Sequence, residues 1–421
     1  MKRPCLVGVL LILVGALCAS TAQAQEWTRF RGPNGAGLSN AIFPAHWEAS
    51  DFAWKTQLPG GGHSSPLLWG DKVFVTCCND QTAECIVACI GAADGKLLWQ
   101  KGFSSHTYPH NGDNSYASST PAVDADHVYV CWSTPEELTL AALDLSGKEL
   151  WRAELGAFVS QHGGGQSPIV VGDVVLLGDD QEGRASFLFG IDRNTGKIKW
   201  KTPREASNKF SPSTPCLYTP KGQPPQAIFL SKAEGVTAID PQTGKMIWQT
   251  KGVFDARPIG SPVITSGGLI VGSCGDGPLG HDLAAVRPPT DGKPATEVWH
   301  NRDETPYITT ALARGDLLFC WSDHGIVTCR RAATGQKVWQ QRVPGGTFYS
   351  SPICCGDTIY NISRTGLVVA IAAADTYKLL GQTPLHEKSQ ATPAVVGDRM
   401  FVRTYTHLYC VMGKGGASAR R

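Results

Sequence analysis

The sequence predicts an all-β fold, an eight-bladed β-propeller with four-stranded antiparallel blades, and three repeated features support this prediction. An apolar pair, an acidic or small residue, a Gly-containing turn and a Trp recur together, most clearly at 142–151, 190–200 and 238–248. A Ser/Thr-Pro pair and an apolar run lie upstream of these units. The units follow one another with a period of about 40–50 residues and strand-like flanks, which is typical of a propeller.

Each copy of the Trp unit has the residues of a β-hairpin followed by an outer strand. The Asp or Asn opens a turn by bonding its own backbone two residues on. The Gly supplies the positive φ that closes a short hairpin loop. We expect the Trp that follows to cover the gap to the next blade and to bury about 150–250 Å² there.

The Ser/Thr-Pro pair marks the start of an innermost strand, because Pro fits a first strand residue whose N–H is not needed in the ladder. One copy has Thr-Ala instead of Thr-Pro. The eight starts are Ser65-Pro66, Thr120-Pro121, Ser167-Pro168, Thr214-Pro215, Ser261-Pro262, Thr310-Ala311, Ser351-Pro352 and Thr392-Pro393.

The outer-strand markers also number eight, and their order predicts how the ring closes. Trp54 precedes the first strand start, whereas Thr392-Pro393 has no Trp after it. We therefore expect the N-terminal strand to complete the C-terminal blade, a clasp that removes free sheet edges. Seven blades is the alternative, if the degenerate Leu380 blade merges with a neighbour. The markers are Trp54, Trp99, Trp151, Trp200, Trp248, Trp299, Trp339 and Leu380.

The N-terminus has the features of an export signal, predicted to span residues 1–24. Lys2 and Arg3 precede a short apolar run, and Ala22-Gln23-Ala24 is a small-x-small cleavage site. The run is too short for a spanning helix, and the bulky Leu17 before Cys18 argues against lipidation. We expect a periplasmic or extracellular protein without a membrane span.

The remaining chain divides into a lead segment at 25–51, one propeller domain at 52–413 and a flexible basic tail at 414–421. Loss of Lys2 and Arg3 leaves 36 basic residues (38 − 2) against 36 acidic ones. This balance, with no basic run before the tail, disfavours a nucleic-acid partner. We expect a monomer.

The cysteines leave more than one interpretation open. Loss of Cys5 and Cys18 leaves 12 of the 14 cysteines, and in an oxidising compartment some should pair. Cys320 with Cys329, and Cys77 or Cys78 with Cys85 or Cys89, could face each other across hairpins. The adjacent pairs Cys77-Cys78 and Cys354-Cys355 are interpreted as buried apolar residues on alternate strand faces rather than as redox pairs. No CxxC spacing supports a zinc site.

The repeat resembles the pyrroloquinoline-quinone (PQQ)-like β-propeller repeat, with its Ala-x-Asp-x-x-Thr-Gly-x-x-x-Trp docking motif. The segments 27–37, 64–66, 114–121 and 391–393 are similar to a group of exported proteins of this class. The resemblance covers nearly all of the mature chain and implies the propeller fold. It does not specify a cofactor, because the same repeat builds quinoprotein dehydrogenases and also the cofactor-free propeller lipoprotein of the outer-membrane protein assembly machine.

A quinoprotein would need carboxylate and amide oxygens around Ca²⁺ and a general base. Eight minimal blades use almost the whole length, and the sequence contains no evident set of acidic residues that must converge on the axis. We therefore favour an exported, non-catalytic binding or scaffold protein with no cofactor, no metal site and no catalytic residues. Its loop-rich face would contact a protein, peptide or glycan. A PQQ- and calcium-dependent oxidoreductase, of the alcohol or sugar dehydrogenase type, is the alternative.

The candidate site lies on the loops that run from an outer strand to the next inner strand, because such loops share one face of a propeller. The longest runs from Trp99 to Pro121, and the next contains Gln161–Gln166. The competing interpretation is a solvated loop whose His and Asn side chains satisfy turn backbone. A metal at His106 and His110 is disfavoured because Pro109 prevents the helix that this spacing needs. The predicted binding residues are His106, Tyr108, His110, Asn114, Tyr116, His162, Gln166, Arg257 and Tyr307.

Overall fold

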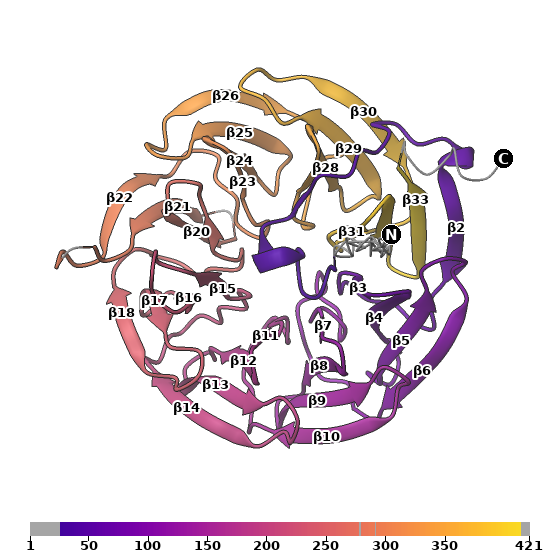
Figure 1. Ribbon diagram of the computed structural model, residues 1–421, viewed down its shortest axis with the longest axis horizontal. Coiled ribbons are helices and arrows are strands. Elements are labelled where there is room, and N and C mark those ends of the chain that lie inside the picture. Colours follow the sequence, from indigo (N-terminus) through magenta and orange to yellow (C-terminus); the bar gives the residue numbers. More distant parts are fainter. Residues whose placement is uncertain (1–25, 278, 291, 414–421) are drawn as a thin grey trace, which may run out of the picture.

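The computed structural model describes residues 26–413 except 278 and 291, and it forms eight sheets around a central axis (Figure 1). Seven sheets have four strands and one has five. This confirms the eight-bladed propeller and excludes the seven-bladed alternative. The predicted signal peptide and the basic tail lie outside the described residues.

Each blade runs from an inner strand near the axis to an outer strand at the wall. The first three blades contain β3(Leu67–Trp69), β4(Lys72–Cys78), β5(Cys85–Gly91) and β6(Leu97–Phe103); β7(Ala122–Val123), β8(His127–Ser133), β9(Leu138–Asp144) and β10(Glu149–Glu154); and β11(Ile169–Val171), β12(Val174–Asp179), β13(Ser186–Asp192) and β14(Ile198–Arg204). The next three contain β15(Cys216–Tyr218), β16(Gln226–Ser231), β17(Gly235–Ile239) and β18(Met246–Thr250); β19(Val263–Ile264), β20(Ile270–Asp276), β21(Leu279–Arg287) and β22(Thr296–Asn301); and β23(Leu312–Arg314), β24(Leu317–Trp321), β25(Ile326–Arg331) and β26(Lys337–Arg342).

The last two blades each include a strand from the N-terminal part of the chain. Blade seven contains β27(Ile353–Cys355), β28(Thr358–Ile362), β29(Leu367–Ala372) and β30(Leu379–Pro384), with β1(Leu38–Ser39) parallel to β27; blade eight contains β31(Ala394–Val396), β32(Arg399–Arg403), β33(His407–Met412) and β2(Phe52–Gln57). The described helical segments are η1(Pro33–Gly35) and η2(Ala49–Asp51), both 3-10 helices. No helix in the described part is long and apolar enough to cross a membrane.

The clasp predicted from the sequence is present. Strand β2 pairs antiparallel with β33, and Trp54 lies opposite Cys410. The chain therefore supplies the outer strand of blade eight before it builds the other blades. This pairing closes the ring without leaving an open edge between the first and last blades.

Six of the seven repeated Trp residues join their blade to the next, as predicted; Trp248 instead bonds Gln226 within its own blade. Trp54 Nε1 donates to Ala92 O at 3.2 Å, and Trp151 Nε1 donates to Arg193 O at 2.9 Å. The indole also covers the turn glycine of the next blade; a Cβ on Gly196 would lie 2.6 Å from the Trp151 ring. Since Gly196 has a φ of +71°, both the turn and the close approach require glycine here. Equivalent indole bonds are made by Trp99, Trp200, Trp299 and Trp339.

The Ser/Thr residues of the strand starts form a second set of links, which the sequence analysis did not predict; seven of the eight neighbouring pairs are bonded. The backbone N–H of Ser65 donates to Thr120 Oγ1, and that of Thr120 donates to Ser167 Oγ, both at 2.9 Å. The last link, from Thr392 N–H to Ser65 Oγ at 3.0 Å, joins the end of the ring to its beginning. We call the eight residues the hydroxyl ring: Ser65, Thr120, Ser167, Thr214, Ser261, Thr310, Ser351 and Thr392.

The structure contains none of the candidate disulfides among its described residues, although Cys78 does lie opposite Cys85 across a hairpin, as expected. Cys77, Cys78, Cys85, Cys89, Cys320 and Cys329 are buried and free. Cys329 lies opposite Phe319 rather than Cys320, so strand register separates that pair. Cys354 and Cys355 belong to two different hydrophobic clusters, as expected for neighbours on opposite strand faces. Burial raises the pKa of the Cys78 thiol to about 12 and so disfavours the reactive thiolate.

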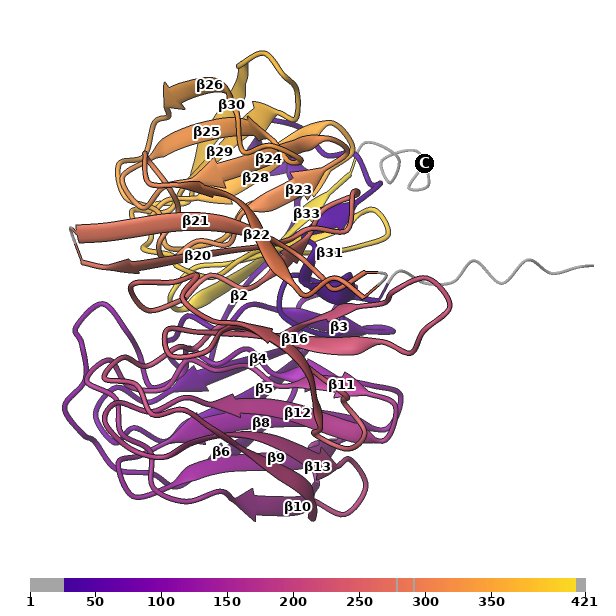
Figure 2. The same cartoon turned by 90° about the vertical axis from the view of Figure 1, so that its left-hand side faces the viewer.

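The lead segment crosses the centre of the ring (Figures 1 and 2). Arg31 is fully buried and donates to Ala311 O at 3.1 Å and to Pro352 O at 2.9 Å. Arg29 donates to Pro215 O, and Asn34 exchanges two hydrogen bonds with the backbone of Leu217. The segment thus bonds inner strands of several blades at once. We call residues 27–39 the axial plug.

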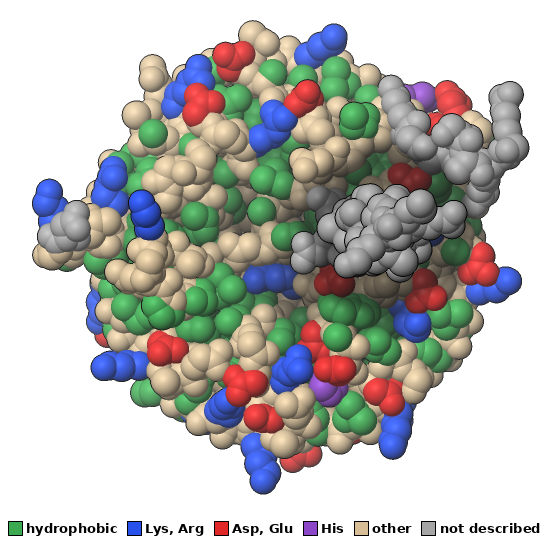
Figure 3. Space-filling model, in the orientation of Figure 1, with side chains coloured by type: hydrophobic (Ala, Val, Ile, Leu, Met, Phe, Trp, Pro, Cys, Tyr) green, Lys and Arg blue, Asp and Glu red, His purple; other side chains and the backbone are tan. Residues whose placement is uncertain are grey.

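On the face shown in Figure 3, acidic and basic side chains are interspersed around the ring. Both signs of charge occur on every side of this view, between hydrophobic and neutral polar side chains. On this face the distribution agrees with the balanced composition of the sequence.

Candidate functional site

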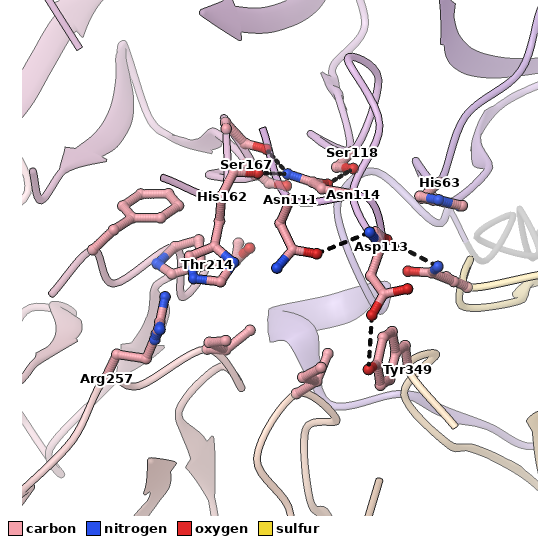
Figure 4. Close-up of a pocket in the computed structure, with 18 of the residues that line it drawn as sticks. His63, Asn111, Asp113, Asn114, Ser118, His162, Ser167, Thr214, Arg257 and Tyr349 are labelled. Carbon is pink, nitrogen blue, oxygen red and sulfur yellow. Dashed lines mark hydrogen bonds between the residues drawn. The ribbon is translucent and has the colours of Figure 1, made fainter. Parts of the chain in front are cut away.

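The loops from outer to inner strands meet at the other end of the axis and surround a cavity of about 550 Å³ (Figure 4). The axial plug forms its floor through Phe30, and the hydroxyl ring lines its wall. We call this cavity the axial pocket. The surrounding loops contribute His63, Asn111, Asp113, Asn114, Gln161, His162, Phe210, Arg257, Tyr307, Tyr349 and Gln390.

One side of the pocket contains Arg257, whose side chain is almost fully buried. Its Nη2 donates to Asp276 Oδ1 at 3.0 Å, and Lys209 Nζ lies 2.7 Å from the other carboxylate oxygen. Lys209, together with Arg257, lowers the pKa of Asp276. Burial and the Arg257 charge lower the pKa of neighbouring His162, so its imidazole is neutral at pH 7. His162 Nε2 and Arg257 Nε are buried and make no hydrogen bond to the described residues.

His63 lies on the opposite side of the pocket (Figure 4). Burial and the nearby charges of Arg403, Lys388 and Arg364 lower its pKa to about 3. The imidazole is therefore neutral at pH 7, with one donor and one acceptor nitrogen. Its Nδ1 is buried without a partner among the described residues. Arg403 is fully buried beside it and donates to Ser64 O at 2.9 Å and Thr76 O at 2.7 Å.

The long loop predicted as the main binding segment reaches across the pocket mouth. Asp113 forms an ion pair with Arg364 and accepts a 3.4 Å hydrogen bond from the Tyr349 hydroxyl, and Gln390 Nε2 donates to Asp113 O at 3.0 Å. Asn114 Nδ2 donates to His162 O at 2.5 Å and so ties the two predicted loops together. The loop thus connects blade two with blades seven and eight over the mouth.

The nine predicted binding residues fall into two groups. Asn114, His162, Arg257 and Tyr307 line the axial pocket. The others do not: Tyr108, His110 and Tyr116 form an aromatic cluster with ring centroids 4.5 to 6.0 Å apart, His106 lies 3.0 Å from Glu136, and Gln166 is buried behind the loop. In this structure the aromatic cluster supports the fold of the long loop.

Sequence reasoning did not select His63, Gln390 or Phe30 as site residues. The run Gly60-Gly61-Gly62 before His63 could have indicated a closely packed loop. In the structure a Cβ on Gly61 would lie 2.3 Å from the Tyr405 ring. Close backbone packing of this kind holds a loop in place. Phe30 carried no such signal because it reaches the pocket only through the path of the axial plug.

The two carboxylates that line the pocket do not fit a calcium site beside a quinone, because both are already paired. Its carboxylates are Asp113 and Asp276, and both are engaged by basic side chains. Ca²⁺ takes six to eight oxygen ligands, several of them carboxylates. Within the described residues, the grouped donors with metal-ligand proximity are Asp124, Asp126 and His127, which do not line this pocket and include two partners of Arg193.

Comparison with known proteins gives a family and a fold. The sequence model of a family described as "Outer membrane protein assembly factor BamB" matches residues 83–341 and 323–417. No curated protein matches the chain at a significant level.

Several solved structures share the fold at low sequence identity. BamB from Moraxella catarrhalis has 14% identity and a TM-score of 0.60, with 86% of this chain and 98% of that chain covered. Quinohemoprotein alcohol dehydrogenase from Comamonas testosteroni has 12% identity and a TM-score of 0.65, with 92% and 80% covered. The computationally designed Ika8 protein has 12% identity and a TM-score of 0.59, with 85% and 98% covered.

Proposed function

Because the chain belongs to the family described as outer membrane protein assembly factor BamB, we propose that it is a non-catalytic binding protein whose loop face holds a segment of a protein partner. The observation that carries this proposal is the axial pocket. Eight loops on a rigid ring surround it, and the axial plug closes its far end, so that a ligand enters and leaves by one mouth.

The chemistry of the pocket favours binding over oxidation. Neutral imidazoles, amides and aromatic rings supply donors, acceptors and flat apolar surface, which suit a peptide segment. The two described carboxylates of the lining are paired with Arg364, Lys209 and Arg257, so that neither is free to bind calcium beside a quinone. We further propose that the protein is exported by its N-terminal segment and acts as a monomer outside the cytoplasm.

Photocrosslinking from single positions tests the binding face. A photoreactive phenylalanine analogue at half-buried His110, or at exposed Gln161 on the pocket lining, should crosslink a protein partner in cells of the source organism. The same analogue at Leu98, which is exposed on the outer strand of blade one, is the matched control and should crosslink little. Partner adducts only from Leu98, or none from His110 or Gln161, would contradict the proposal.

The oxidoreductase alternative is tested separately. The purified full-length mature protein is mixed with PQQ and Ca²⁺ and passed over a desalting column, and the quinone absorbance that remains with the protein is measured. We expect none above background and no dye-linked oxidation of alcohols or sugars. Retention of one quinone per chain would overturn the non-catalytic assignment. Adducts to a glycan rather than a protein in the crosslinking experiment would change the partner class.

A further inference from the structure

The hydroxyl ring presents unused hydrogen-bond donors to the axial pocket. Seven of the eight hydroxyl oxygens accept a backbone N–H from the preceding blade, as Thr310 Oγ1 does from Ser261 N at 3.0 Å. Within the described residues, none of the eight hydroxyls donates to a protein acceptor, although all eight line the pocket. A hydroxyl has one O–H donor besides its acceptor lone pairs. The protons of the ring are therefore available to a ligand on the axis.

Three buried guanidinium groups next to this ring have no carboxylate partner among the described residues. Arg29 and Arg31 bond the carbonyls of Pro215, Ala311 and Pro352, each directly after a member of the hydroxyl ring. Arg403 bonds the carbonyl of Ser64, directly before Ser65. Burial lowers the pKa of Arg31 to about 9 and that of Arg29 to about 10, which leaves both groups charged at pH 7.

The remaining charges at the pocket offset one another. Asp113 pairs with Arg364, and Asp276 pairs with Lys209 and Arg257, whose Nη1 also lies 3.9 Å from Glu182 Oε1. His63 and His162 are neutral, because burial and nearby cations lower the pKa of each. The three arginines therefore leave a net positive potential at the floor and wall. Buried charges are normally paired, so the missing anion points to a ligand.

We propose that the axial pocket binds a carboxylate carried on an apolar or aromatic body. The carboxylate lies on the axis, where ring hydroxyls donate to it and the buried arginines stabilise its charge in a low-dielectric setting. Phe30, Phe210, Tyr307 and Tyr349 provide the apolar surface for the rest of the ligand. The inference rests on the proposed function because it concerns the ligand of the same pocket. The carboxylate belongs either to the end of a partner polypeptide or to a small organic acid.

Matched pairs of ligands test the charge requirement without altering the protein. Calorimetry on the full-length mature protein compares 3-phenylpropionate with 3-phenylpropionamide, and the peptide Ala-Gly-Ala-Phe with its C-terminal amide. We expect the acid of a pair to bind at least about tenfold more tightly than its amide, as a charge-assisted contact in a buried site provides. A preference in the peptide pair alone identifies a polypeptide end as the source, and a preference in the small pair identifies a free acid.

A charge placed at the pocket mouth tests the location. Gln390→Glu adds a carboxylate of nearly the same shape to the pocket lining, and Gln100→Glu adds one to exposed strand β6 on the outer wall. We expect Gln390→Glu to weaken the acid about fivefold and to leave the amide unchanged. Gln100→Glu should alter neither ligand.

Three outcomes would overturn this inference: equal affinity of acid and amide in both pairs, absence of binding by all four probes at millimolar concentration, or equal effects of the two glutamate variants. Its failure is distinguishable from failure of the proposed function. Protein adducts from His110 without any acid preference would leave the binding role standing and remove only the carboxylate.

Discussion

The plug and the axial pocket lie at opposite ends of the same ring of eight inner strands. Their polar side chains differ in how far their hydrogen bonds are satisfied. At the plug end, Arg29, Arg31 and Asn34 bond the inner-strand backbone directly. At the pocket end, the hydroxyl protons of the ring, His63 Nδ1 and His162 Nε2 have no hydrogen-bond partner within the described residues. The difference indicates that the plug end serves stability, whereas the pocket end keeps polar groups available for a ligand.

The largest expected effect concerns the plug. Arg31→Ala removes two hydrogen bonds to Ala311 O and Pro352 O and leaves a cavity where a fully buried side chain stood. We expect a loss of about 3–4 kcal/mol in the free energy of unfolding, measured by urea denaturation. Arg184→Ala, at an exposed turn, is the control and should cost less than about 0.5 kcal/mol. Similar losses for both variants would remove the stabilising role of the plug.

The clasp strand β2 closes the ring, and its Trp54 provides the next test. Trp54→Ala removes the bond to Ala92 O and the cover over Gly95 in blade one. We expect a loss of about 2–3 kcal/mol. Trp248 bonds Gln226 within its own blade, so Trp248→Ala should cost about half as much. Thermal denaturation of both variants gives the ranking. A reversed order would show that docking to the next blade contributes little.

The pocket end should be sensitive to acid through His63. Its pKa is about 3 in the folded protein against about 6.5 in the unfolded chain. The unfolded state then binds the proton first, so this residue costs stability as pH falls from 6.5 towards 3. Between pH 6.5 and 5 the cost is about 1.5 kcal/mol. Urea denaturation at both pH values should show that loss in the wild type and a correspondingly smaller loss in His63→Gln. The same pH dependence in both proteins would contradict the assignment.

The smallest effect on stability is expected at the mouth. Asp113→Asn breaks the ion pair with Arg364, whose partners are about half and one-third exposed, so the loss should stay below about 1 kcal/mol. Proteolytic cleavage of the loop at 103–121 should nevertheless become several times faster, because the loop loses its anchor to blade seven. Asp357→Asn breaks the exposed pair with Arg314 and is the control. Unchanged cleavage in Asp113→Asn would show that the ion pair does not hold the loop.

Features that depend on one repeat, or on two neighbouring repeats, could be predicted from the sequence. The Trp and its turn Gly recur at nearly constant spacing, so the docking of Trp151 on Gly196 follows from two neighbouring copies. Even the clasp could be deduced, because Trp54 is a repeat element out of phase with the others. The candidate site was predictable in part: Asn114, His162, Arg257 and Tyr307 lie in the loops selected and line the pocket.

What the sequence alone determined was therefore the number of blades, their order and the face on which long loops gather. The tertiary structure decided which side chains meet on the axis. His63, Asp113 and Tyr349 come from different blades, and Phe30 reaches them only because the plug crosses the ring. The physical reason is range: hairpin and docking contacts join residues within one repeat length, whereas the pocket depends on ring closure, which brings residues hundreds of positions apart to one axis.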